Sequence, residues 1–236
     1  MTKNIVNTAL VLVGAGSLLS GCSFEQPESV CFVQESPSWA VKYDPVDAPR
    51  DANGAECTTT APLVELMGVY KYVNPQTGDA QLALRPAALV SRAVADTTTT
   101  PQDQTSLGSL DNTLQSDDFC NATNFAPAFV NVAASDTAPA NTIRYEFSNV
   151  RVYSAAEAPG TQFTGEVKFT SNGCTSSYVM RAVWPPSPCD TTATEPADNC
   201  GAGSGLNPDF AVVCQPTTAT GTTGYCVPAN PIPSFK

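Results

Sequence analysis

Histidine is absent from the 236 residues of the chain, and this absence excludes several classes of function. A Ser-His-Asp triad, a Cys-His nucleophile and an imidazole-ligated metal site each need a histidine side chain. The chain also lacks a Ser-x-x-Lys motif, and its glycine-rich stretch at 201–205 does not lie between a strand and a helix as a nucleotide-binding loop would. The sequence therefore predicts no catalytic residue, no cofactor and no metal site.

Charged residues are also scarce, at 14% of the chain, and basic residues are the scarcer kind. The 11 Lys and Arg stand against 22 Asp and Glu, which gives a formal net charge of −11. Removal of residues 1–21, which carry only Lys3, would lower this charge to −12. Such a surface is repelled by nucleic acid and by anionic headgroups, so we expect no nucleic-acid partner.

No comfortable transmembrane helix is expected at the N-terminus, because spanning a bilayer needs about 20 apolar residues. The uncharged stretch at 5–19 is shorter and follows the positive charge of Lys3. It has the length of the hydrophobic part of a secretory signal, and the small residues Ser20 and Gly21 come next, as a cleavage site requires. The residue after them is Cys22.

The run Leu19-Ser20-Gly21-Cys22 resembles the lipobox of bacterial lipoproteins, in which such a tripeptide precedes the cysteine that becomes acylated. The resemblance covers the first 22 residues and implies a diacylglyceryl thioether on Cys22, usually with another acyl chain on its amine. Two or more chains give lasting attachment to a membrane. Ser23, not Asp, follows the anchor, which implies the outer membrane more than the inner one. The alternative is an ordinary secretory signal with a chance cysteine.

The remaining cysteines predict disulfides. Cys-x-x-Cys pairs are missing, and the spacings exceed those of zinc motifs. With Cys22 set aside, an even number remains: Cys31, Cys57, Cys120, Cys174, Cys189, Cys200, Cys214 and Cys226. In an exported protein this favours four disulfides. The composition changes at Pro185, so we expect the last four cysteines to pair among themselves. Sequence order alone suggests Cys31–Cys57 and Cys120–Cys174.

The composition favours strands, turns and long loops, since the chain has 20 Pro, 15 Gly and many Thr and Ser. We expect a mainly β fold, with an antiparallel, sandwich-like domain over residues 61–184. A signal peptide at 1–21 and a segment at 22–60, which holds the anchor, a tether and irregular structure, precede it. A Pro- and Cys-rich segment at 185–236 follows it.

Two regions carry the clearest strand patterns. A hairpin is expected at 63–84, in which Tyr70 and Tyr72 share the face opposite Met67 and Val69. Residues 142–184 predict further strands, with a β-bulge at Ser148-Asn149 and a tight turn at Asn172-Gly173. Residues 87–95 fit either a helix or a strand. A brief helix is predicted from the spacing of Leu107, Leu110 and Leu114.

Two classes of function remain open. Lack of catalytic motifs favours a membrane-anchored, non-catalytic envelope protein with a structural, adhesive or assembly role, for example in surface motility, and with protein partners in the envelope. The alternative is an exported ligand-binding module or a hydrolase that uses carboxylates. For a hydrolase, Asp117-Asp118 is a candidate pair, and Tyr70 and Tyr72 could stack on a sugar. Two converging, desolvated carboxylates would favour the hydrolase.

Overall fold

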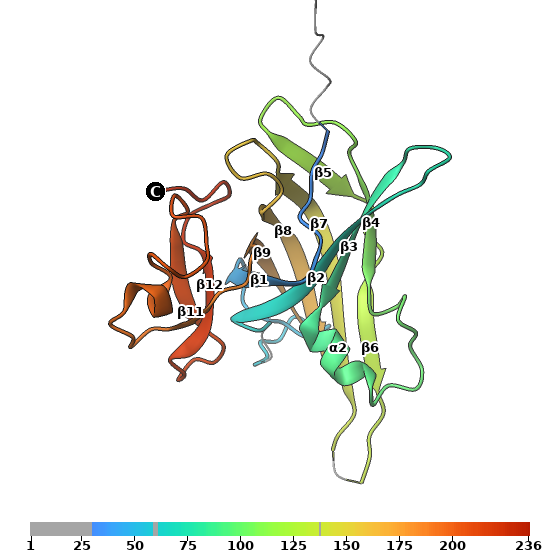
Figure 1. Cartoon of the computed structure of the whole chain (residues 1–236). Helices are drawn as coiled ribbons and strands as arrows, with labels where there is room; N and C mark the ends of the chain where they lie inside the picture. Colours follow the sequence, from blue (N-terminus) through green and yellow to red (C-terminus); the bar gives the residue numbers. More distant parts are fainter. Residues whose placement is uncertain (1–29, 59–60, 137) are drawn as a thin grey trace, which may run out of the picture.

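The computed structural model describes residues 30–58, 61–136 and 138–236, and in this part of the chain nine strands form one antiparallel sheet (Figure 1). In their order across the sheet, the strands are β5 (Phe119–Thr123), β4 (Ser106–Leu110), β3 (Ala80–Pro86), β2 (Val64–Val73), β1 (Ser36–Pro45), β9 (Cys174–Val183), β8 (Gln162–Ser171), β7 (Asn141–Tyr153) and β6 (Ala128–Val132). The mainly β, antiparallel fold predicted from the sequence is confirmed.

The sheet closes on itself because β5 pairs with both β4 and β7. The long strand β7 has two partners on this side, since its residues 150–153 pair with β5 and its residues 141–145 pair with β6. Between these two parts, the register of β7 against β8 shifts at Ser148/Arg151, which is the expected bulge. Opposite walls of the closed sheet therefore face each other across a shared interior.

The interior is filled by alternate side chains of the strands. Trp39 of β1 lies fully buried against Phe163 of β8, with ring centroids 5.2 Å apart. Met67 and Leu82, on β2 and β3, are equally inaccessible to solvent. Each such side chain contributes about 1.5–3 kcal/mol through burial, so the interior is the main source of stability. The inward position of Met67 and the outward position of Tyr72 agree with the predicted faces of the hairpin.

The expected hairpins are present, and one expected helix is wrong. The strands β2 and β3 pair in register, and Asn172-Gly173 joins β8 to β9 with positive φ at both residues. Residues 87–93 form the short helix α2 (Ala87–Ala93). Leu107 and Leu110, however, lie in the strand β4, because pairing with β3 and β5 gives this segment backbone partners that a brief helix would lack.

The segment from α2 to β4 is fixed by Asp96. Its carboxylate accepts hydrogen bonds from the N–H and hydroxyl groups of Thr98 and Thr99 and from the N–H of Asn131, at 2.6–3.1 Å. Burial opposes ionisation, but these bonds outweigh it and hold the pKa of Asp96 well below its ordinary value. The run of threonines at 97–100 is thus a loop whose conformation is fixed by hydrogen bonds to Asp96.

The same segment covers the outer edge of β6. On the side of β6 that faces away from β7, the N–H of Phe129 donates to the Asp103 carbonyl at 2.7 Å. The next outward N–H, that of Asn131, donates to Asp96 at 2.6 Å. Both edge donors are therefore satisfied within the molecule.

The C-terminal residues form a small sheet with the order β10 (Pro188–Asp190), β12 (Thr223–Pro228) and β11 (Val212–Pro216). The 3₁₀ turn η1 (Pro196–Asn199) lies between β10 and β11 in the chain. Side chains of these C-terminal residues pack against the large sheet, where Val227 and Ile232 share a buried cluster with Ala40 and Val183. The small sheet starts close to the boundary predicted at residue 185. That this boundary separates two domains stays a prediction.

The described part of the chain contains four disulfides: Cys31–Cys120, Cys57–Cys174, Cys189–Cys214 and Cys200–Cys226. The last four cysteines pair among themselves, as expected. The guesses Cys31–Cys57 and Cys120–Cys174 are wrong, because strand pairing places each partner next to a cysteine far away in sequence. Cys174 begins β9, which pairs with β1 and, through Thr175, with Arg50. The segment 22–60 also contains more regular structure than expected, since β1 lies in the middle of the sheet between β2 and β9. The unbroken buried run at 39–41 fits its central place, because Trp39 and Val41 belong to the interior cluster and Ala40 to the cluster shared with the small sheet.

Among the described residues, no helix has the length and apolar character needed to cross a membrane.

Candidate functional site

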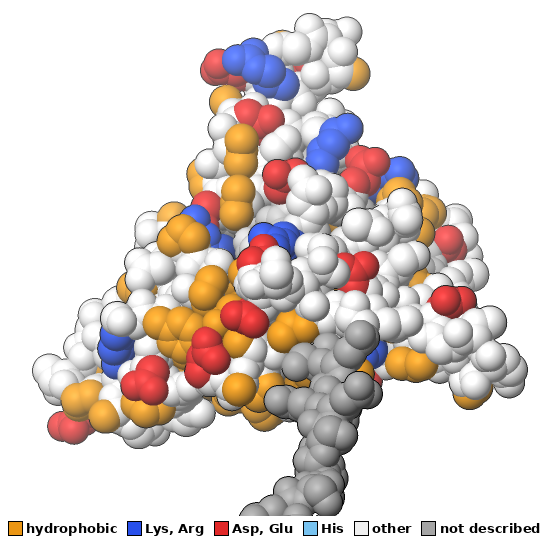
Figure 2. All heavy atoms as spheres, turned by 90° about the horizontal axis from the view of Figure 1, so that it is seen from above, with side chains coloured by type: hydrophobic (Ala, Val, Ile, Leu, Met, Phe, Trp, Pro, Cys, Tyr) orange, Lys and Arg blue, Asp and Glu red, His pale blue; other side chains and the backbone are white. Residues whose placement is uncertain are grey.

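The attachment segment, residues 30–34, is the described part of the chain that lies nearest in sequence to the predicted anchor. Cys22 itself lies outside the described residues. Val30 follows it by eight residues, and a chain extends by at most about 3.6 Å per residue, so an anchor on Cys22 would keep Val30 within about 30 Å of the lipid. Val30 and Phe32 are 68% and 48% exposed. Figure 2 shows this end of the molecule, with hydrophobic side chains gathered on it and acidic ones among them.

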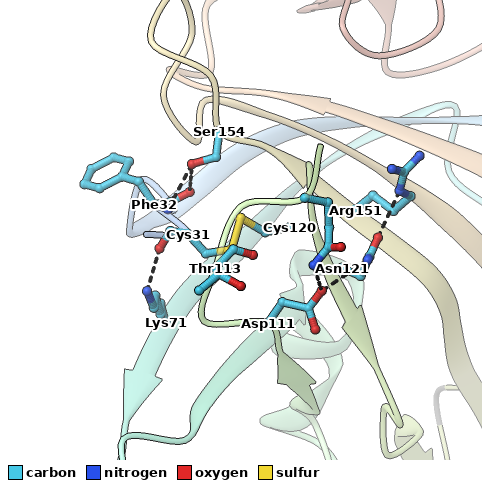
Figure 3. Close-up of a disulfide and its surroundings, with 10 residues drawn as sticks. Cys31, Phe32, Lys71, Asp111, Thr113, Cys120, Asn121, Arg151 and Ser154 are labelled. Carbon is cyan, nitrogen blue, oxygen red and sulfur yellow. Dashed lines mark hydrogen bonds between the residues drawn. A yellow bond between two sulfur atoms is a disulfide. The ribbon is translucent and has the colours of Figure 1, made fainter. Parts of the chain in front are cut away.

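A disulfide joins the attachment segment to β5 (Figure 3). The Cα atoms of Cys31 and Cys120 are 5.7 Å apart, and both residues are buried. Beside the disulfide, the N–H of Cys31 donates to the Asn112 carbonyl at 3.1 Å, and Val30 forms a β-bridge with Thr113. The segment is thus fixed to the loop between β4 and β5 as well as to β5.

Hydrogen bonds join the segment to β2 and to the start of the loop after β7. Lys71 of β2 donates from Nζ to the Cys31 carbonyl at 2.6 Å, and burial lowers the pKa of Lys71. On the other side, the N–H of Phe32 donates to Ser154 Oγ at 2.9 Å, and this hydroxyl donates to the Phe32 carbonyl at 3.0 Å. Figure 3 shows Lys71 and Ser154 approaching the segment from opposite sides.

The loop between β7 and β8 lies directly against the segment. The N–H of Gln34 donates to the Gly160 carbonyl at 2.9 Å. Gly160 has φ +59°, and a Cβ atom at this position would lie 2.4 Å from the Phe32 carbonyl oxygen. Only glycine therefore allows the two backbones to approach so closely.

A chain of polar side chains continues from the disulfide across β5 and β7. Asn121 donates to Asp111 Oδ2 at 3.1 Å and accepts from Arg151 Nε at 3.1 Å (Figure 3). Arg151 also pairs with Asp117, and its guanidinium carbon lies 4.1 Å from the centre of the Phe119 ring. The end of the sheet that receives the attachment segment is therefore cross-linked covalently, by backbone bonds and by side chains.

Asp117 and Asp118, the carboxylate candidates from the sequence, do not form a desolvated pair. Both side chains are exposed. The hydrogen bond from Arg151 holds the pKa of Asp117 below its ordinary value, so this carboxylate is ionised and neutralised by a neighbouring cation. This arrangement is typical of a surface ion pair, and it offers no raised-pKa carboxyl that could act as a general acid.

One carboxylate does lie inside the closed sheet, and sequence analysis missed it. Glu65 of β2 is 7% exposed, and its Oε1 accepts hydrogen bonds from the hydroxyls of Tyr43 at 2.6 Å and Tyr145 at 2.9 Å. Its Oε2 accepts from the N–H of Ala88 at 3.1 Å, which caps the start of α2. Burial raises the pKa of Glu65, although the three hydrogen bonds favour its ionised form.

The surroundings of Glu65 indicate that it stabilises the fold. Its contacts come from β1, β7 and α2, so it ties opposite walls of the sheet and the helix together. Burial and the charge of Glu65 raise the pKa of Tyr43 and of Tyr145, which remain proton donors. The signal available in the sequence was its position two residues before Met67, because residues i and i+2 of a strand share a face.

The outer groove, on the outside of β1–β4 and beside α2, is the second candidate. It consists of two adjoining hollows of about 310 and 680 Å³ that share the side chain of Arg85. Gly68 and Tyr70 line the smaller hollow, and Tyr72, Gln81 and Gln102 line the larger one. In register across the strands, Tyr70 lies opposite Ala83 and Tyr72 opposite Gln81. The structure thus places the two predicted tyrosines in one groove, where Tyr72 is 54% exposed.

The cysteines of the small sheet lie close together but are not free to bind a metal. The Sγ atoms of Cys189, Cys200 and Cys214 lie within 4.8 Å of one another. Each is oxidised in a disulfide, and metal ligation needs a thiolate. Their proximity reflects two disulfides packed side by side across β10, β11 and β12.

Comparison with known proteins identifies relatives of the chain. The model of the MlpA family matches residues 37–185, which cover most of the large sheet. The protein named "Putative lipoprotein MlpA" from Myxococcus xanthus is 84% identical over 236 residues, and the match covers 100% of both chains. No solved structure matches the chain.

Proposed function

Since the chain belongs to the MlpA family and is a bacterial lipoprotein, we propose that it serves as a non-catalytic component of the cell envelope, in a structural, adhesive or assembly role. The proposal includes acylation of Cys22 and, because Ser23 follows it, attachment to the outer membrane. It also includes protein partners in the envelope, and surface motility is one process that such an assembly could serve.

The attachment segment is the observation that carries this proposal. A protein that connects a partner to a membrane transmits any pull through the residues next to its anchor. Here those residues are joined by a buried disulfide to β5 and by hydrogen bonds to β2 and to the loop after β7. A force applied at Val30 is therefore distributed over several strands of a closed sheet. This construction suits a load-bearing connection.

The buried and exposed carboxylates support the non-catalytic part of the proposal. Glu65 is enclosed by the two tyrosines and α2, and Asp117 is paired with Arg151. Among the described carboxylates, these two do not meet in a cleft, and hydrolysis of a glycoside needs two carboxyls roughly 5–10 Å apart across the substrate. Of the alternatives, an exported ligand-binding module has one observation in its favour, the outer groove.

The anchor is tested by Cys22→Ala, with Ser23→Asp as a matched control that leaves the cysteine in place. Cys22→Ala should remove incorporation of labelled palmitate, release a folded protein from the membrane fraction and reproduce the phenotype of a gene deletion. Ser23→Asp should still incorporate palmitate but move the protein from the outer to the inner membrane. Full function of the unanchored protein, or turnover of a substrate by the purified protein, would contradict the proposal.

A further inference from the structure

The outer groove differs in charge from the rest of the protein. The chain has 22 acidic residues and a net charge of −11, yet neither hollow of the groove is lined by Asp or Glu. The charged side chain that lines both hollows is Arg85. Two acids adjoin lining residues in the sequence: Glu65 has its carboxylate in the interior of the sheet, and Asp103 accepts hydrogen bonds from Thr100 through its carboxylate. The groove is thus a local positive site on an acidic surface.

Arg85 is unusual among the arginines of the described residues. Four of the six form ion pairs with Asp or Glu, and Arg85 does not. Its Nη2 donates to the Oε1 of the buried Gln104 at 3.3 Å, which fixes the direction of the guanidinium. Its Nε is buried and has no hydrogen-bond partner in the protein. An atom that is closed to solvent is also closed to a ligand, so an anionic acceptor in the groove would contact the Nη groups of this half-buried side chain, which lines both hollows.

The other groups that line the groove are suited to sugar rings. Residues two apart on a strand lie on the same face about 7 Å apart, so Tyr70 and Tyr72 offer two successive aromatic side chains. The negative face of an aromatic ring attracts the C–H groups on the apolar face of a sugar. Gln81 and Gln102 supply amide donors and acceptors for hydroxyl groups. Gly68 lies opposite Arg85 in the sheet, and because it has no side chain it leaves space at the floor of the smaller hollow.

The position of the groove argues against a peptide. An extended peptide is commonly recognised by main-chain hydrogen bonds at a free sheet edge. The strands beneath the groove have partners on both sides, because β2 lies between β1 and β3, and β3 lies between β2 and β4. A ligand on this face can contact side chains only. Duplex nucleic acid carries one charge per about 1.7 Å, which the net charge of −11 disfavours, whereas an acidic polysaccharide carries at most one carboxylate on each ring and so spaces its charges more widely.

We propose that the outer groove binds an acidic polysaccharide, with a sugar carboxylate on Arg85 and neighbouring rings against Tyr70 and Tyr72. The site goes beyond the proposed envelope role and does not depend on the anchor, so failure of either proposal leaves the other standing.

The test is calorimetric titration of the lipidated protein, in a nonionic detergent and about 150 mM salt, with oligogalacturonate. Fully methyl-esterified oligomers of the same length are the neutral control, and poly-glutamate is the acidic peptide control. The wild-type protein should bind oligogalacturonate and neither control. Absence of binding to oligogalacturonate, or equal binding of poly-glutamate, would overturn the proposal.

Three variants locate the binding. Arg85→Gln should weaken it about 10- to 100-fold, since it removes a charge-assisted hydrogen bond. Tyr72→Ala should weaken it about three- to tenfold through loss of ring contact. Gly68→Ala should weaken it by adding a methyl group to the floor of the groove, and the fold should tolerate it because a Cβ there has only ordinary contacts, the nearest being 3.4 Å from Tyr70.

The matched control is Lys168→Gln, which removes an exposed positive charge of β8, outside the groove, and should leave the affinity unchanged. Circular dichroism and urea unfolding of each variant establish that it is folded. Undiminished binding by folded Arg85→Gln and Tyr72→Ala proteins would refute the assignment of the groove. An equal loss in Lys168→Gln would show that binding follows overall charge, and would refute it as well.

Discussion

Glu65→Gln should flatten the dependence of stability on pH. Burial raises the pKa of Glu65 in the folded protein above the ordinary value of 4.5, so the unfolded chain loses this proton at a lower pH than the folded protein does. Stability from this group is complete below pH 4.5 and is lost as the pH rises toward the folded pKa, above which the loss is constant. Between these limits the free energy of unfolding should fall by up to about 1.4 kcal/mol per pH unit.

Little else in the protein titrates in this window. The chain has no histidine, and the eight cysteines after Cys22 are in disulfides. The aspartates whose pKa values are shifted, such as Asp47 and Asp117, have lowered values and are ionised above pH 5. Burial lowers the pKa of Lys71, which makes stability rise with pH on the alkaline side, the opposite sign to Glu65. A fall of stability above pH 5 therefore reports mainly on Glu65.

The assay is urea unfolding of the disulfide-intact protein at pH 5, 6, 7 and 8, with three variants. Glu65→Gln should lose the slope, and Glu166→Gln, which changes an exposed glutamate of β8, should keep it. Glu65→Leu leaves the Tyr43, Tyr145 and Ala88 donors without an acceptor, so it should cost at least about 3 kcal/mol at every pH, from about 1–3 kcal/mol per buried donor. Wild-type stability that stays constant or rises over this range, or a Glu65→Gln protein with the wild-type slope, would refute the reasoning.

Three further predictions concern the attachment segment and the acid side of the pH profile. Cys31→Ser with Cys120→Ser should lower the free energy of unfolding by about 4.6 kcal/mol in the chain-entropy model, because the disulfide spans 89 residues; urea unfolding measures the change. Gly160→Ala should cost about 1–3 kcal/mol, because of the positive φ and the approach to Phe32, and should speed hydrogen exchange of the Phe32 and Gln34 amides, as NMR would show. The lowered pKa of Asp96 means that its contribution is present above its ordinary pKa of 3.8 and is lost below it, so Asp96→Asn should reduce the loss of stability between pH 4 and pH 2.

Local signals in the sequence predicted the parts of the fold that depend on neighbouring residues. The Asn172-Gly173 turn and the bulge at Ser148 follow from backbone preferences and a change of phase within a single strand, and both are present. The strand β4 was mistaken for a helix because the spacing of its leucines fits both structures. Its strand conformation is decided by pairing with β3, which lies about 20 residues earlier in the chain, and with β5, which has no clear strand pattern in the sequence.

The features that depend on closure of the sheet could not be predicted in the same way. Cys31 pairs with Cys120 because β5 turns back onto β7, and no local pattern marks this contact. Burial of Glu65 also depends on closure, which brings Tyr145 from the opposite wall. The tyrosines of the outer groove were recognised as a shared face, but Arg85 was not, since its lack of an acidic partner is visible only in three dimensions.

The covered edge of β6 limits association between copies of the protein on a membrane. Lipoproteins confined to a surface meet one another at high local concentration, and an open strand edge would let successive copies join their sheets. The bonds from Phe129 and Asn131 to the segment that begins at Asp96 occupy the donors through which such stacking would start. This edge of the large sheet therefore offers no free outward N–H group in β6 to a strand of a neighbouring copy.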